Sequence, residues 1–184
     1  MKKIFIIQTQ LIKLVFVLSL SWFGAITSAI AQQNCNTNFV ETAPAARFIV
    51  NGDGTVTDRQ TGLMWAQCPQ GLVGENCSGT LSTFNWTDAL ALNQASSDTQ
   101  NRDDWRLPNI KELVSLVEFA CSRPAINLTV FPNTADTNSL IFWSSSPVAE
   151  SFSAMTRVVQ FNSGVDSVSD RASLQAVRLV RGRE

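Results

Sequence analysis

Histidine and tyrosine are both absent from this 184-residue sequence. Without histidine, the chain lacks the side chain that ordinarily titrates near neutral pH, and a histidine-activated serine or cysteine nucleophile is excluded. Ser144-Ser145-Ser146 is not set in the G-x-S-x-G turn of serine hydrolases. A serine–lysine dyad would need Lys111, whose place at a helix start favours a solvated charge, and paired carboxylates as in glycosidases stay open. The available acids include Asp103, Asp104, Glu112, Glu118 and Asp136.

Motifs that would bind a metal or a cofactor are also lacking. The turn Asn51-Gly52-Asp53-Gly54 resembles part of a calcium loop, but an EF-hand alignment places Ile49 and Gln60 where carboxylates are required. No glycine-rich loop precedes a helix in the pattern that holds a phosphate. The sequence therefore predicts no cofactor and no metal site. Calcium is the one ion that stays open, and no motif supports it.

A hydrophobic run long enough to span a membrane is missing as well. The apolar run Leu14–Ile26 is shorter than the roughly 20 residues that a spanning helix needs. It follows the positively charged start Met1-Lys2-Lys3 and precedes Ala29-Ile30-Ala31, a small-x-small cleavage pattern. We predict a signal peptide over residues 1–31 and a periplasmic or secreted protein with no membrane span after cleavage. Residues 32–46 are then a polar lead-in segment.

Basic charge is scarce in the predicted exported chain. Loss of Lys2, Lys3 and Lys13 would leave 11 basic against 15 acidic side chains, a formal charge of −4. A mildly acidic chain is not expected to bind nucleic acid. A local basic patch for a sulfated glycan stays open, and the sequence predicts no oligomeric state.

The four cysteines all lie in the predicted exported part, which favours two disulfides in an oxidising compartment. Three pairings are open. We favour Cys68–Cys77, which closes a short glycine-rich loop, and by exclusion Cys35–Cys121. A zinc site is the alternative, but the chain has no C-x-x-C pair and no histidine.

The order of the expected elements indicates an α+β domain rather than alternating β-α units. A hairpin joins residues 48–50 to 55–57 across the Asn51–Gly54 turn, and a third strand follows at 63–66. One helix is expected from Asn85 to about Asn93, and a second from Asn109 to near Cys121. Residues 124–140 form a long loop. The remaining strands are expected at 141–146, 157–161, 165–168 and 174–180.

The densest polar stretch is D-W-R-L-P-N-I-K-E-L, which covers residues 104–113. Pro108 and Asn109 are typical of a helix start, and Glu112 lies at the position of a capping box. Trp105 is expected in the core, while Asp104 and Arg106 could pair with each other or with loop backbone. This stretch therefore predicts a structural motif rather than a reactive site. Trp65, Trp86 and Trp143, like Trp105, lie in apolar segments that favour the core over a sugar-stacking site.

Several segments together resemble one known family. These are G-D-G-T-V-T-D-R-Q-T-G-L-M-W, the D-W-R-L-P-N-I-K-E-L stretch with V-S-L-V, P-A-I-N, F-W-S-S-S-P and V-R-L-V-R-G. In this order they resemble the C-terminal domain family of the Legionella collagen-like adhesin, over residues 47–182. The resemblance implies a C-type-lectin-like fold, with two helices packed on short antiparallel sheets. It also implies a surface domain that engages sulfated glycosaminoglycans and forms trimers, although this chain has no collagen-like stalk upstream.

The sequence thus favours an exported binding module that recognises a glycan or an envelope protein, and not an enzyme. Its expected contact surface is the long loop and the ends of the closing strands. The candidate ligand-binding residues there are Asn133, Asp136, Asn138 and Arg157. The alternatives are an enzyme acting on envelope polysaccharide through Asp103 or Asp104 with Asp136, or a structural subunit of the envelope.

Overall fold

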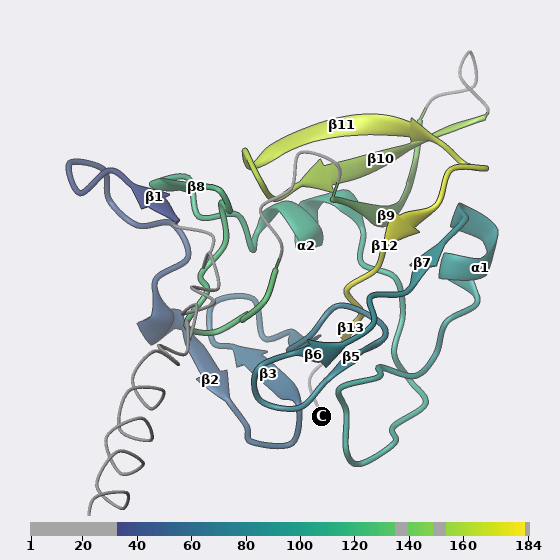
Figure 1. Cartoon of the computed structure of the whole chain (residues 1–184), viewed down its shortest axis with the longest axis horizontal. Helices are drawn as coiled ribbons and strands as arrows, with labels where there is room; N and C mark the ends of the chain where they lie inside the picture. Colours follow the sequence, from purple (N-terminus) through teal and green to yellow (C-terminus); the bar gives the residue numbers. More distant parts are fainter. Residues whose placement is uncertain (1–32, 135–139, 149–153, 183–184) are drawn as a thin grey trace, which may run out of the picture. The chain divides into compact units, whose positions relative to one another are not determined.

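The computed structural model describes residues 33–134, 140–148 and 154–182. Within these ranges, a five-stranded sheet has the order β11-β10-β9-β12-β7 (Figure 1). Its strands are β7 (Thr83–Phe84), β9 (Ile141–Pro147), β10 (Met155–Gln160), β11 (Val165–Asp170) and β12 (Gln175–Ala176). Three of the neighbouring pairs are antiparallel, while β12 runs parallel to β9. The sheet is therefore mixed, whereas antiparallel strands alone were predicted.

A second sheet has four antiparallel strands in the order β13-β4-β3-β2. Its strands are β2 (Phe48–Val50), β3 (Thr55–Asp58), β4 (Met64–Ala66) and β13 (Val180–Arg181). The predicted hairpin is confirmed, with Ile49 opposite Thr57. Its turn is fixed by Gly54, which has a φ of +81° and lies so close to Ser97 that a Cβ would collide with the Ser97 carbonyl oxygen.

Two short strand pairs carry the disulfides, and both predicted pairings are confirmed. β1 (Asn34–Cys35) pairs with β8 (Cys121–Ser122), and Cys35 lies directly opposite Cys121. β5 (Leu72–Val73) pairs with β6 (Ser78–Gly79), and the Cys68–Cys77 disulfide closes the loop that contains them. The first disulfide spans 86 residues and ties the lead-in segment to the region after α2.

The C-terminal segment differs from the prediction of one strand over residues 174–180. It forms β12 in the five-stranded sheet and β13 in the four-stranded sheet. Between them Val177, Arg178 and Leu179 are fully buried, so the backbone leaves the first ladder to place all three inside. The chain thereby links the two sheets, as the yellow trace between β12 and β13 shows in Figure 1.

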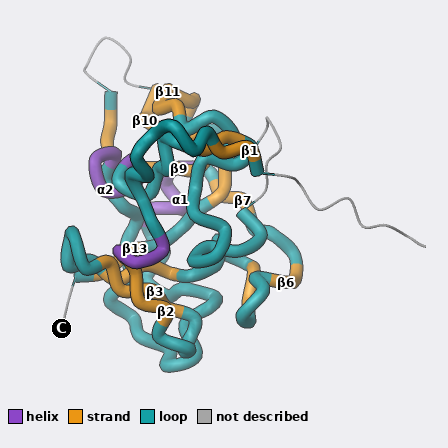
Figure 2. The backbone as a smooth tube through the Cα atoms, turned by 90° about the vertical axis from the view of Figure 1, so that its left-hand side faces the viewer, coloured by secondary structure: helices purple, strands orange, loops and turns teal. Residues whose placement is uncertain are grey.

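The helices are shorter than the sequence pattern predicts, and loops join most elements (Figure 2). They are η1 (Ala45–Arg47), α1 (Trp86–Leu90) and α2 (Ile110–Val114). The apolar stripe after α2 is still buried at Leu116 and Val117, but the chain turns there. The N–H of Glu118 donates to the carbonyl of Ala125 instead of to a helical partner. Long-range backbone pairing has replaced the last helical turns.

The D-W-R-L-P-N-I-K-E-L stretch is the predicted structural motif. Asn109 and Glu112 form a complete capping box at the start of α2. Trp105 and Leu107 are buried in one core cluster with Trp143. The pairing of Asp104 with Arg106 is wrong, however. Asp104 pairs with Arg181, and Arg106 forms a two-bond ion pair with Glu112 that braces the cap from outside.

Candidate functional site: a groove between the lead-in segment and β8

A surface groove of about 600 Å³ lies beside the Cys35–Cys121 disulfide. Its walls come from β1, from the lead-in residues that follow it, from β8 and from the turn between β10 and β11. The lining residues are Asn34, Cys35, Asn36, Thr37, Phe39, Phe119, Ala120, Cys121, Ser122 and Ser163.

Two phenylalanines on the groove are exposed to solvent. The exposed fraction is 64% for Phe39 and 60% for Phe119, and among the described residues no other aromatic side chain is classed as exposed. Trp65, Trp105 and Trp143 are buried in the core, as the sequence predicts. Because large apolar side chains gathered at a surface hollow typically mark a binding site, the two phenylalanines distinguish this groove from the rest of the described surface.

Half of the lining residues are polar but uncharged, and the rest are the two phenylalanines, Ala120 and the disulfide. Asn34, Asn36 and Thr37 come from the lead-in side, and Ser122 and Ser163 come from the opposite side. Amide and hydroxyl groups donate and accept hydrogen bonds without the desolvation cost of an ion. The groove can therefore take a ligand with an apolar surface and several hydroxyl or amide groups.

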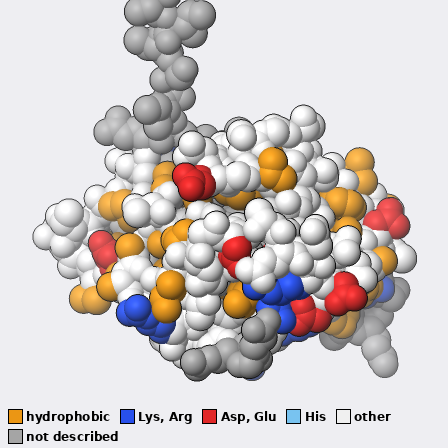
Figure 3. Space-filling view, turned by 90° about the horizontal axis from the view of Figure 1, so that it is seen from below, with side chains coloured by type: hydrophobic (Ala, Val, Ile, Leu, Met, Phe, Trp, Pro, Cys, Tyr) orange, Lys and Arg blue, Asp and Glu red, His pale blue; other side chains and the backbone are white. Residues whose placement is uncertain are grey.

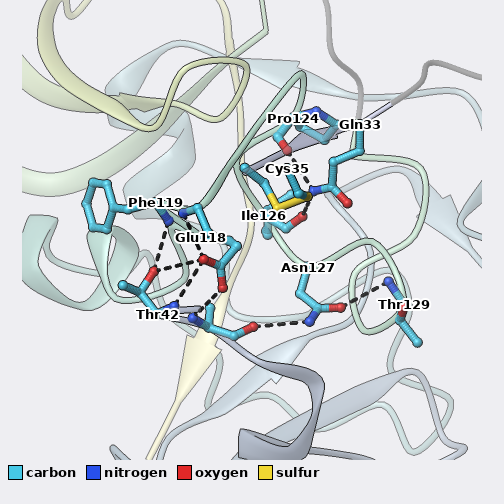
Figure 4. Close-up of a disulfide and its surroundings, with 12 residues drawn as sticks. Gln33, Cys35, Thr42, Glu118, Phe119, Pro124, Ile126, Asn127 and Thr129 are labelled. Atoms are coloured by element: carbon cyan, nitrogen blue, oxygen red, sulfur yellow. Dashed lines mark hydrogen bonds between the residues drawn. A yellow bond between two sulfur atoms is a disulfide. The ribbon is translucent and has the colours of Figure 1, made fainter. Parts of the chain in front are cut away.

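Glu118 joins the lead-in segment to the residues that precede β8 (Figure 4). Glu118 is only 3% exposed. Its carboxylate accepts hydrogen bonds from the backbone N–H groups of Thr42 at 3.0 Å, Ala43 at 2.7 Å and Ala120 at 2.9 Å. The Thr42 hydroxyl in turn accepts the N–H of Phe119 at 2.9 Å. One buried carboxylate thus fixes the lead-in segment against the residue that carries the exposed ring.

These hydrogen bonds set the ionisation of Glu118. Burial acts to raise the pKa of its carboxyl, but the donated N–H groups of Thr42, Ala120 and Ala43 and the Thr42 hydroxyl outweigh it and hold the pKa below its usual value. Glu118 is therefore a carboxylate at neutral pH with its lone pairs engaged. It acts as an anchor for backbone, and not as a proton donor.

Two amide side chains add further anchors on the same side (Figure 4). Gln33 donates from Nε2 to the carbonyls of Pro124 at 2.8 Å and Ile126 at 2.7 Å. Asn127 donates from Nδ2 to the carbonyl of Ala43 at 3.1 Å. Together with the disulfide, these contacts make the lead-in segment part of the folded domain.

The predicted ligand-binding residues lie elsewhere in the described structure or outside it. Asn133 donates from its amide to the carbonyl of Cys77 at 2.8 Å and so braces the stapled loop. Arg157 on β10 pairs with Asp166 on β11. No described contact joins Asn133 to Arg157, and neither lines the groove. Asp136 and Asn138 fall outside the described residues.

Of the acids considered for catalysis, three are held in structural contacts, Asp103 is exposed, and Asp136 lies outside the described residues. Asp104 pairs with Arg181, Glu112 pairs with Arg106, and Glu118 binds backbone. Within the described ranges, no three Asp, Glu, Cys or His side chains gather in a way that could hold a metal ion. The same ranges contain no helix with the length and hydrophobicity to span a membrane.

The sequence pattern did not mark Phe39 or Phe119 as binding residues. One signal was present, because Phe39 and Val40 are the only large apolar residues in the polar stretch 32–42. Phe119 follows the apolar stripe of α2 directly and was indistinguishable from it by spacing. The groove itself had no signal, since its two walls come from segments that only the tertiary structure brings together.

Together, the two sheets, the paired disulfides and the aromatic groove define a small disulfide-stapled α+β domain with a surface hollow suited to binding. A family model then gives its relationship: the Lcl C-terminal domain matches residues 54–181, and the chain belongs to this family. Searches of curated proteins and of solved structures find no significant match.

Proposed function

We propose that this protein is an exported binding module that recognises a glycan or another component of the cell envelope through the groove beside the Cys35–Cys121 disulfide. The observation that carries the proposal is the pair of exposed phenylalanines on that groove, in a domain of an adhesin-related family. The two disulfides are consistent with a periplasmic or extracellular location, which the predicted signal peptide also favours.

Binding to immobilised glycans and to isolated envelope fractions tests the proposal. The protein should be purified with both disulfides closed, since the groove spans one of them. Saturable binding to at least one glycan or envelope component supports the function. Absence of saturable binding to every glycan and every fraction would contradict it.

A C-type-lectin-like arrangement is part of the same proposal. Two short helices, mixed small sheets and two disulfides support it. A crystal structure compared with C-type lectin domains provides the test, and a different strand connectivity would argue against the arrangement.

A further inference from the structure

We infer that the groove binds an uncharged saccharide, with sugar rings lying on Phe39 and Phe119. This inference rests on the proposed function and specifies its ligand. A pyranose ring has a face of C–H groups and an edge of hydroxyl groups. The groove offers a matching set, with two exposed aromatic rings for the face and amide and hydroxyl side chains for the edge.

The lining itself favours an uncharged ligand over an acidic or sulfated one. Its ten residues include no arginine and no lysine, so an anionic group could gain a cation only from outside the lining, where the exposed Arg123 follows Ser122. Elsewhere five arginines already pair with acids. The pairs are Arg47–Asp58, Arg102–Asp98, Arg106–Glu112, Arg157–Asp166 and Arg181–Asp104. On the face shown in Figure 3, one cluster of blue groups lies beside red ones.

Polarity decides against an apolar peptide or lipid. Asn34, Asn36, Thr37, Ser122 and Ser163 make up half of the lining, and covering them with an apolar ligand would remove water from groups that then lack partners. The hydroxyl groups of a saccharide can replace that water. An uncharged sugar is therefore the ligand that satisfies both the aromatic and the polar lining.

Half of the groove lies outside the part of the chain that matches the family. The family match covers residues 54–181, so Phe119, Ser122 and Ser163 belong to the shared domain. The other wall, from Asn34 to Phe39, precedes the matched region and is attached by the disulfide and by Glu118. Half of the proposed binding surface is therefore built by the lead-in segment, so both this segment and the matched domain would contact the ligand.

The test is a glycan array with uncharged, uronic-acid and sulfated glycans, followed by titration of the best ligand. Wild type is compared with Phe39→Ser, with Phe119→Ser and with Leu174→Ser, which changes an apolar residue of equal exposure outside the groove. We expect binding to uncharged glycans, weakened about tenfold by each phenylalanine variant and unchanged by the control. Binding should vary little between about 0.1 and 1 M NaCl, because no ion pair is involved.

Phe119→Trp keeps an aromatic face and should retain binding, which separates loss of the ring from loss of the fold. Binding only to sulfated glycans, abolished by high salt, would overturn the uncharged-saccharide inference and leave the binding module intact. Binding to an uncharged glycan that neither serine variant weakens would also overturn it, since the site would lie elsewhere. Failure to bind any glycan or envelope fraction would overturn both proposals.

Discussion

Glu118 and Thr42 lie 76 residues apart in sequence and are joined by hydrogen bonds in the folded protein. Glu118 accepts the Thr42 N–H, while the Thr42 hydroxyl donates to the carbonyl of Val117 at 2.9 Å and accepts the N–H of Phe119. The lead-in segment is thus bonded to the backbone on both sides of Glu118. This relationship places Phe119 at the groove and makes its position depend on residues far away in sequence.

Replacing Glu118 with glutamine should destabilise the protein by about 1 to 3 kcal/mol. The charge-assisted hydrogen bonds would be lost, and the new NH₂ group would face backbone donors. Urea unfolding at neutral pH measures the change. Glu41→Gln is the matched control. Glu41 is exposed in the lead-in segment next to Thr42, so this substitution should shift the unfolding midpoint little. Equal effects of the two substitutions would show that Glu118 is not an anchor.

Stability should fall in acid and stay flat near neutrality. Burial raises the pKa of Glu118, Asp58, Asp98 and Glu112, but hydrogen bonds outweigh it and each pKa lies below its usual value. Since the folded pKa values are depressed, the stabilisation is complete above the unfolded values of about 4 and is lost as pH falls through the folded ones. No histidine titrates between about pH 6 and 8.

Unfolding midpoints measured from pH 8 down to pH 2.5 test this profile. The gap between wild type and Glu118→Gln should narrow as the pH drops below about 4, since the carboxyl is then protonated in the unfolded chain and becomes protonated in the folded protein only at lower pH. A gap that stays constant over the whole range would contradict the assignment of Glu118 as an ionised anchor.

Removing the Cys35–Cys121 disulfide should lower the free energy of unfolding more than removing the Cys68–Cys77 disulfide. On the loop-entropy model, the 86-residue separation corresponds to about 4 to 5 kcal/mol and the 9-residue separation to about 2 to 3 kcal/mol. The paired variant Cys35→Ala with Cys121→Ala should also expose the lead-in segment. Amide hydrogen exchange should then become faster at residues 34–43, with smaller changes elsewhere. Wild-type protection at residues 34–43 would refute the anchoring role of the disulfide.

Arg178 is fully buried, and no ion pair with an acidic side chain is found for it among the described residues. Its guanidinium donates to the carbonyls of Ala66 and Gln67 and to the Thr134 hydroxyl, and it lies 4.8 Å from the centre of the Phe131 ring. Burial lowers the pKa of Arg178 to about 9. The segment between β12 and β13 is therefore held by hydrogen bonds rather than by an ion pair.

Arg178→Ala should destabilise the protein by about 3 to 5 kcal/mol, because it leaves buried acceptors without donors and opens a cavity. Arg178→Lys should not restore stability, since one ammonium cannot reproduce the planar donor geometry. Thermal unfolding measures both, with Arg59→Ala at an exposed position as the control. A lysine variant as stable as wild type would show that charge alone suffices.

Local sequence patterns predicted the features that depend on neighbouring residues. The Asn51–Gly54 turn predicted the β2–β3 hairpin because its glycines adopt positive φ, and Asn109 with Glu112 predicted the capping box of α2. The short Cys68–Cys77 loop indicated its own disulfide, and Cys35–Cys121 followed by exclusion. Distinct motifs in a fixed order also identified the family.

Only the tertiary structure decided where helices end and where the groove forms. The apolar spacing after Asn109 fits a helix, but Glu118 N–H pairs with Ala125 and ends it early. Residues 174–180 have the pattern of one strand, yet burial of Arg178 against Ala66 and Gln67 divides them between two sheets.

The groove shows the same limit most clearly. Phe39 and Phe119 had no shared pattern in the sequence, because the contacts that bring them together span 75 to 86 residues. The amino-acid sequence predicted the family, the turns and the cap, and it favoured the cysteine pairing that the structure confirms. The groove depends on long-range hydrogen bonds and on a disulfide between residues that are far apart in sequence. These residues meet only when the chain packs into its tertiary structure.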